Sequence, residues 1–357
     1  MTEKSNSHSG TRLLVIAAAL VIIVWGINQA QSVLVLFLVS VFLAVIGTPP
    51  VLWLQRKRIP SAVAVLIVLA GMIVILVMVG LLVVTSIKRI SDALPFYQTR
   101  LQQQVLALKT LLASIGIAVN DKVLLEHLNP EALSSRVVGL FAGVSSAFSK
   151  AVLILLTVSF ILLEASSFPI KLRAALGDPR AHFPQFVKFV NDIKRYVVIQ
   201  TAISLTAGVL IGIWLSVLGV DFAILFGLLT YLLNYVPNVG SVIVLIPVVI
   251  LTFIQFGMGR TALAAAGYVV VVFFLGNVVQ PRLMGQKLGL STLVVFLSLI
   301  FWGSLLGLIG MVLCVPFTMT LKFALESSED TRWIALLLGP EAPTESIPPV
   351  SKRGRNK

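Results

Sequence analysis

Long apolar runs alternate with short polar segments along most of the chain, and this pattern predicts helices that cross a membrane. A helix needs about 20 residues to span the ~30 Å hydrocarbon core of a bilayer. We expect the first two runs to form an uncleaved helical hairpin, with Pro49-Pro50 ending its second helix, since proline lacks an amide proton. A cleaved signal peptide is the alternative. The five runs interpreted as spans are residues 13–27, 32–46, 61–87, 151–163 and 196–218.

Two polar insertions interrupt the spans. In residues 88–150, apolar side chains recur from Leu101 to Ile115 at steps of four and three, which predicts an amphipathic helix. That helix either packs on the protein's own outer surface or mediates self-association. In the second insertion, residues 166–195, helical spacing behind Pro184 predicts a helix that lies along the membrane surface.

Two further apolar stretches are too long for one span and short for two. Residues 221–256 are interrupted at 234–240, and residues 291–325 are interrupted by the glycine-rich segment 303–310. An ordinary span, residues 261–280, lies between them. Two arrangements fit this pattern: ten complete crossings, or six crossings plus two re-entrant hairpins. The predicted fold class is therefore an all-α polytopic membrane protein with six to ten membrane-inserted passes, including two Pro/Gly-interrupted helical hairpins.

Composition supports membrane insertion, and charge placement gives an orientation. Hydrophobic residues make up 58% of the 357 positions and charged residues 11%, with a mean hydropathy of +1.03. With the N-terminus (residues 1–12) and the tail (residues 326–357) in the cytoplasm, 19 of the 27 Lys and Arg residues lie inside. The insertion 88–150 is then extracytoplasmic and the insertion 166–195 is cytoplasmic. Because the positive-inside rule accounts for the net charge of +13, nucleic acid is not an expected partner.

The reactive residues are too few and too scattered for catalysis or metal binding. Cys314 is the single cysteine, and the three histidines lie far apart in polar segments. The acidic residues fall in loops and tails, with only Glu164 and Asp221 bordering the hydrocarbon. We therefore expect no enzyme activity, no cofactor, no metal site and no carboxylate relay of the kind used in proton-coupled transport.

The C-terminal motifs resemble a known family. The segment Asn234-Tyr235-Val236-Pro237-Asn238-Val239-Gly240, followed by Pro247, is similar to the signature of the autoinducer-2 exporter family, also called PerM-like permeases. The segment from Pro281 to Gly285, and then Trp302-Gly303, Gly307, Gly310 and Pro316, are similar as well. The resemblance implies export of small solutes across the bacterial inner membrane, a quorum-sensing signal in some members and ions by proton antiport in others. It also implies a homo-oligomer, with a pentamer as one arrangement.

Non-helical backbone inside a membrane survives only against protein or a wet cavity, so the interruptions mark a candidate solute pathway through residues 219–325. Neutral amides there donate and accept hydrogen bonds, which suits a hydroxyl-rich solute. We expect Gln200 only to join helices.

The leading function is export of a small polar solute by alternating access; a monovalent cation/proton antiporter and a non-transporting scaffold are the alternatives. Besides the solute, membrane lipid is the expected partner. The candidate pathway residues are Asn234, Pro237, Asn238, Gly240, Asn277, Gln280, Arg282, Gly303, Gly307 and Gly310.

Overall fold

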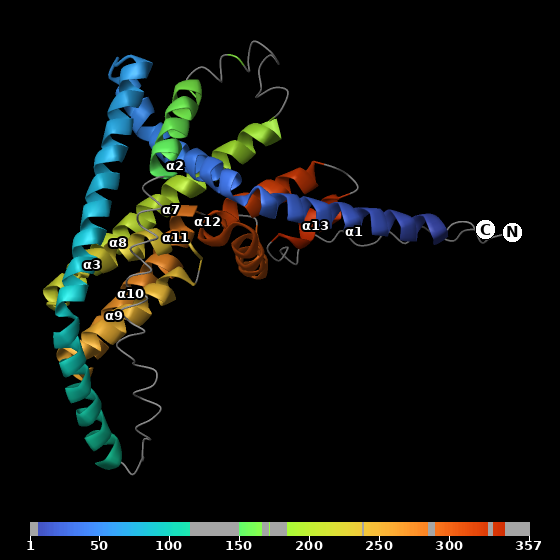
Figure 1. The fold of residues 1–357 in the computed structure, drawn as a ribbon. Helices are drawn as coiled ribbons and strands as arrows, with labels where there is room; N and C mark the ends of the chain where they lie inside the picture. The colour runs from blue at the N-terminus through green and yellow to red at the C-terminus, as the bar shows by residue number, and fades with distance from the viewer. Residues whose placement is uncertain are drawn as a thin grey trace.

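The regular elements of the computed structural model are all helices in the part of the chain that it describes (Figure 1). Five of these helices are long and apolar enough to cross a membrane, which confirms the all-α polytopic fold class. The candidate spans are Gln31–Arg56, Ser61–Ala93, Phe186–Val217, Met258–Met284 and Thr292–Glu326. The structure describes residues 6–114, 150–165, 171, 184–237, 239–284, 290–327 and 331–339.

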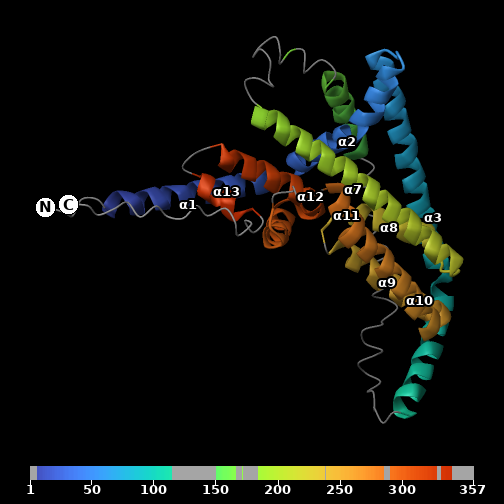
Figure 2. The same cartoon turned by 180° about the vertical axis from the view of Figure 1, so that it is seen from behind.

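The first two helices differ from the expected hairpin. Helices α1 (Asn6–Gln29) and α2 (Gln31–Arg56) meet at Ala30; α1 contacts α12, and its N-terminal part extends beyond the other helices (Figures 1 and 2). Helical hydrogen bonding continues through the junction, because Ala30 N–H donates to Gly26 and Leu34 N–H donates to the Ala30 carbonyl. The junction contains amides and alanine but no glycine or proline, so nothing in its sequence forces the chain to reverse.

The expectation that Pro49-Pro50 ends the second helix is wrong. Both prolines lie inside α2, which continues to Arg56. In apolar surroundings, leaving the helix would expose more backbone groups than the two donors that the prolines lack. The Thr48 hydroxyl also donates to the Ala44 carbonyl, 2.7 Å away, within the turn that precedes the prolines.

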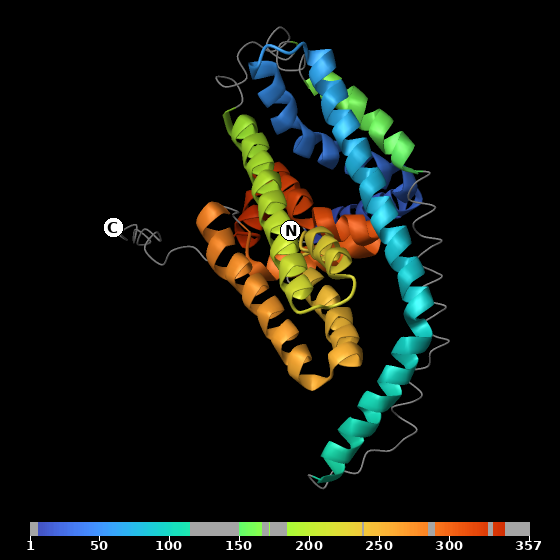
Figure 3. The same cartoon turned by 90° about the vertical axis from the view of Figure 1, so that its left-hand side faces the viewer.

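Helix α3 (Ser61–Ser114) joins the third predicted span to the start of the outer insertion as one helix of 54 residues. Its C-terminal part extends beyond the ends of α9 and α10 (Figure 3). The backbone of the predicted amphipathic segment is helical as far as Ser114. Its apolar side chains from Leu101 to Ile115, and the rest of the insertion up to residue 149, lie outside the described residues. The fourth span appears as a helix over residues 150–165.

The prediction of a separate surface helix before the fifth span is wrong, because both belong to one helix, α7 (Pro184–Val217). The helix begins at Pro184 as expected, but it continues without a break into the fifth span. No glycine or proline separates Pro184 from Gly208 in the sequence, so the backbone stays helical where the polarity changes.

The first interrupted stretch forms a hairpin of α8 (Ala223–Leu233) and α9 (Gly240–Phe256), with 11 and 17 residues. At ~1.5 Å per residue these limbs reach only about 16 and 26 Å, short of a complete crossing. The turn between them contacts Gln200 and Thr201, which lie at the middle of α7. Both ends of the hairpin lie near the C-terminal end of α7, so the geometry favours the re-entrant alternative for this stretch.

The chain continues from α9 through α10 (Met258–Phe274), a π-helical turn η1 (Leu275–Val279) and α11 (Gln280–Met284). The second interrupted stretch is α12 (Thr292–Glu326), and α13 (Arg332–Leu337) follows it. Gly307 breaks α12 with φ 63° and ψ −145°, a conformation that glycine adopts at little steric cost. The two limbs then pack together, with the indole N–H of Trp302 3.3 Å from the Thr318 hydroxyl.

Two apolar clusters hold these helices in place. One joins α7, α8, α9 and α10 around the fully buried Ile211, Val248 and Tyr268. The other joins the N-terminal half of α7 to α12 through Val197, Cys314 and Val315. Between the two clusters, the middle of α7 carries the buried polar side chains of Gln200 and Ser204.

Candidate functional site

A cavity of about 410 Å³ lies beside the middle of α7, where the α8–α9 turn meets the π-helical turn η1. Among the described residues that line it, none is acidic or basic, and amides, hydroxyls and apolar side chains are mixed. They are Tyr196, Gln200, Asn234, Val236, Pro237, Ser241, Val242, Leu245, Tyr268, Val269, Val272, Phe273, Gly276, Asn277, Gln280, Leu290, Val295 and Val315.

Gln200 connects the three parts of the cavity wall. Its Nε2 donates to the backbone carbonyl of Asn234, 2.8 Å away, at the end of α8. Its Oε1 accepts a hydrogen bond of 3.2 Å from Nε2 of Gln280, the first residue of α11. The carbonyl at a broken helix end lacks its usual intrahelical donor, and Gln200 supplies one. The side chain, which is 4% exposed, therefore fixes the hairpin turn against α7 and α11.

Hydroxyl groups complete the attachment of the turn. Nδ2 of Asn234 donates to the Ser204 hydroxyl, 3.0 Å away, one helical turn beyond Gln200 on α7. The Tyr235 hydroxyl donates to that of Thr201 over 2.8 Å. On the opposite wall, the Tyr268 hydroxyl donates to the Ser241 carbonyl, 3.0 Å away, in the first turn of α9. In surroundings of low dielectric, a buried polar group without a hydrogen-bond partner costs free energy. These hydrogen bonds therefore favour one position of the turn over others.

The π-helical turn shapes the side of the cavity formed by α10. Single π turns inside α-helices are uncommon and often occur at functional sites. Here the turn carries Gly276 and Asn277, which both line the cavity. The Asn277 amide donates to the Phe273 carbonyl, 3.1 Å away. A Cβ added at Gly276 would meet no heavy atom within 4 Å, so this position faces open space.

The cavity brings together four of the ten predicted pathway residues: Asn234, Pro237, Asn277 and Gln280. Asn238 lies outside the described residues. Gly240 does not line the cavity. It packs against the end of α8, where a Cβ would lie 1.7 Å from the Leu233 carbonyl oxygen. Arg282 is exposed on α11 and does not line the cavity.

The three remaining glycines lie at the break in α12. Gly307 makes the break itself. At Gly303 a Cβ would come within 2.9 Å of Met311, and at Gly310 within 1.9 Å of the Trp302 carbonyl oxygen. These glycines allow the two limbs of α12 to approach closely, and they are not among the cavity-lining residues.

The sequence did not single out Ser204, Tyr196 or Tyr268 as members of the site. Gln200 was expected only to join helices; it does join them, and it also lines the cavity. One sequence signal was available, because Gln200 and Ser204 stand four residues apart on an otherwise apolar helix and therefore share a face. The tyrosines gave no comparable signal, since aromatic residues in a span usually pack as apolar groups.

Comparison with known proteins places this geometry in context. The model of the AI-2E family of transporters matches residues 13–330. TqsA of Escherichia coli (strain K12), named an AI-2 transport protein, is 37% identical over 330 residues, covering 92% of this chain and 96% of TqsA. YhhT of the same organism is 33% identical over 348 residues, covering 98% of this chain and all of YhhT. A Haemophilus influenzae protein is 35% identical over 347 residues, covering 95% and 98%.

Proposed function

Since the chain belongs to the AI-2E family of transporters, and is thus a membrane transport protein, we propose that it exports a small, neutral, hydroxyl-rich solute across the bacterial inner membrane. The name of its relative TqsA suggests autoinducer-2 or a molecule of similar size and polarity. The single observation that carries the proposal is the uncharged amide and hydroxyl cavity at the middle of α7.

The chemistry of the cavity fits such a solute better than an ion. Asn234, Asn277 and Gln280 offer both donors and acceptors, which complement hydroxyl and carbonyl groups. A volume of about 410 Å³ lies within the ~300–1,000 Å³ range of small-molecule sites. Cation/proton antiport usually relies on buried carboxylates, and none occurs among the described residues of the cavity wall.

Alternating access in this proposal is a movement of the α8–α9 hairpin against α7. Glycines flank the hairpin at both ends, with Gly219 at φ 75° and Gly257 at φ 73°. Such positions absorb changes in backbone direction at low cost. The hairpin turn is held to α7 and α11 by few hydrogen bonds, all through Gln200 and its neighbours, so a solute that competes for those donors can shift the turn.

The test is efflux from proteoliposomes that are loaded with autoinducer-2. The purified protein should release it faster than protein-free vesicles, and Gln280→Leu should lower the rate by about tenfold through loss of one part-buried polar contact. Gln103→Leu, the same change at an exposed position of α3, is the matched control and should leave the rate unchanged.

Other outcomes would contradict the proposal. A sodium-dependent signal from a pH dye trapped in the vesicles, without release of autoinducer-2, would favour the antiporter. No flux of any of these solutes from folded, reconstituted protein would favour the scaffold. Equal rates for the Gln280 and Gln103 variants would remove the cavity from the pathway.

A further inference from the structure

A second cavity, of about 580 Å³, lies between α2 and α7 and is separate from the polar cavity. It differs in chemistry, because its lining is apolar except for Thr48 and two cations. The lining residues are Val45, Thr48, Pro49, Pro50, Leu52, Trp53, Arg56, Lys194 and Val198. Helix α7 stands between the two cavities, with Lys194 and Val198 facing this one and Tyr196 and Gln200 facing the other.

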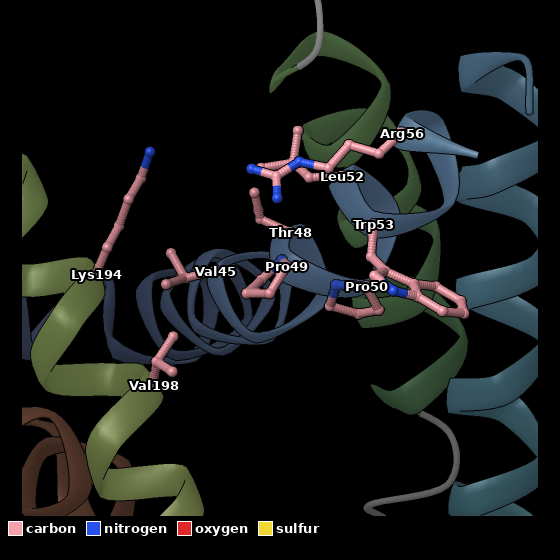
Figure 4. Close-up of a pocket in the computed structure, with 9 residues that line it drawn as sticks. All are labelled: Val45, Thr48, Pro49, Pro50, Leu52, Trp53, Arg56, Lys194 and Val198. Atoms are coloured by element: carbon pink, nitrogen blue, oxygen red, sulfur yellow. The ribbon is translucent and has the colours of Figure 1, made fainter. Parts of the chain in front are cut away.

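The charges are gathered at one end. Arg56 is the last residue of α2 and Lys194 lies in the N-terminal third of α7, and both cations line this cavity. Figure 4 shows them on opposite walls at the same end of the cavity, with Val45, Pro49 and Val198 further along it. No acidic side chain among the described residues pairs with either cation. An anion that bridges both would satisfy them.

The part of α2 that lines the cavity is about as long as one leaflet of a bilayer is thick. Val45 and Arg56 are eleven positions apart on α2, which corresponds to about 16 Å at ~1.5 Å per residue. Half of a ~30 Å hydrocarbon core is about 15 Å. Both walls belong to helices that are long and apolar enough to span a membrane. In a bilayer we expect the apolar end of the cavity at the depth of the acyl chains and the cationic end at the headgroups.

Trp53 also indicates that the cationic end of the cavity lies near the headgroups. Its ring is 56% exposed, and Nζ of Lys57 lies 3.9 Å from the ring centroid. Tryptophan and basic residues are enriched where membrane spans meet the headgroup region. Arg56, Lys57 and Arg58 form a basic turn at this end, which the positive-inside rule assigns to the cytoplasmic leaflet, where anionic lipids are concentrated.

We propose that the α2–α7 cavity is a binding site for an anionic phospholipid of this leaflet. The phosphate lies between Arg56 and Lys194, and one acyl chain follows the apolar groove past Leu52, Pro49 and Val198. The prolines contribute apolar rings and remove two backbone donors from this wall of the groove. Basic pockets between membrane helices are known to select acidic lipid headgroups in this way.

The test places the photoreactive residue p-benzoylphenylalanine at Leu52, which is 47% exposed in the cavity, in protein reconstituted with equal amounts of phosphatidylglycerol and phosphatidylcholine. Mass spectrometry of the product identifies what occupies the groove. The expected product is an adduct of phosphatidylglycerol in excess over phosphatidylcholine. The double substitution R56Q/K194Q should lower this preference by up to about 30-fold, since each basic residue near an acidic membrane surface is worth roughly fivefold.

The matched control is K88Q/R89Q, which removes the same charge from exposed positions of α3 outside the cavity, on the extracytoplasmic side of the membrane in the predicted topology, and should keep the preference. A crosslink to a second copy of the chain, or within the chain, would show a different occupant and overturn the proposal. Equal labelling of the two lipids would overturn it as well. Loss of the phosphatidylglycerol adduct on adding millimolar inorganic phosphate would assign the cations to a free anion instead. The R56Q/K194Q protein should elute from size exclusion like the unmodified protein, so that misfolding is distinguished from lost binding.

Discussion

The hydroxyl of Tyr97 on α3 donates a 2.7 Å hydrogen bond to Oδ2 of Asp221, which lies 124 residues later at the mouth of the α8–α9 hairpin. Gln255, at the other end of the same hairpin, donates to the same carboxylate oxygen. The long helix α3 is thereby attached to both ends of the element that we propose to move. Asp221 was expected to be an interfacial end residue, and it is exposed where this contact forms.

We predict that Tyr97→Phe weakens this attachment without changing the fold. A hydrogen bond to a charged acceptor is lost, and because Asp221 is exposed we expect the cost in unfolding free energy to be about 1 kcal/mol. Thermal unfolding in detergent should show a transition a few degrees lower, and hydrogen exchange should rise near Tyr97 and Gln255. Asp92→Asn, which alters an exposed acid on the same helix, should leave both measurements unchanged. An unaltered transition for Tyr97→Phe would mean that the attachment does not contribute to stability.

The same contact predicts a pH dependence. Burial, and then the hydrogen bond to Asp221, raise the pKa of Tyr97 from 10.0 to about 12. Because the folded pKa is the higher one, the stability that this phenol contributes is complete below pH 10.0 and is lost as pH rises through about 12. The difference in unfolding temperature between the unmodified protein and Tyr97→Phe should therefore be constant at neutral pH and shrink above pH 10. A difference that instead grows in this range would contradict the assignment.

Gly208 and Gly212 give a matched pair for the contact between α7 and α8. A Cβ at Gly208 would lie 2.6 Å from the Gly227 carbonyl oxygen, whereas one at Gly212 would meet its nearest neighbour at 3.7 Å. We predict that Gly208→Ala lowers the unfolding free energy by about 1–3 kcal/mol through overpacking, while Gly212→Ala is tolerated or slightly stabilising. Thermal unfolding of both variants measures this. If Gly208→Ala lowers the unfolding temperature no more than Gly212→Ala does, the helices can separate at no cost and the prediction fails.

Gly276 tests the cavity by filling it. Gly276 lines the polar cavity and a Cβ there would meet no heavy atom within 4 Å, so Gly276→Leu should fold normally and obstruct the solute, with a large loss of autoinducer-2 efflux. Gly259→Leu is the matched control, because that glycine also has open space around it but lies outside the cavity. Normal efflux from the Gly276 variant would contradict the proposed route.

Local sequence properties determined the class of fold and the positions of its breaks. Apolar runs with few charges have no stable arrangement outside a membrane, and this predicted the spans. Proline and glycine limit or extend the accessible backbone conformations at their own positions, and this located the interruptions at residues 234–240 and within residues 303–310, where the structure breaks the helix at Gly307. At Pro49-Pro50 the prediction of a helix end was wrong. There the helix-breaking tendency of proline was weaker than the cost of exposing backbone groups in an apolar region.

The tertiary structure alone decided which polar side chains meet. Gln200 and Gln280 are 80 residues apart, and Tyr97 and Asp221 are separated further still; each pair forms because helices pack at particular angles and depths. Hydrophobic periodicity does not predict which side chains meet, since it shows which face of a helix is apolar and not which helix covers that face. The sequence thus specified a membrane protein with two broken hairpins, and the packing of α7 against them created the polar cavity from amides that looked unrelated along the chain.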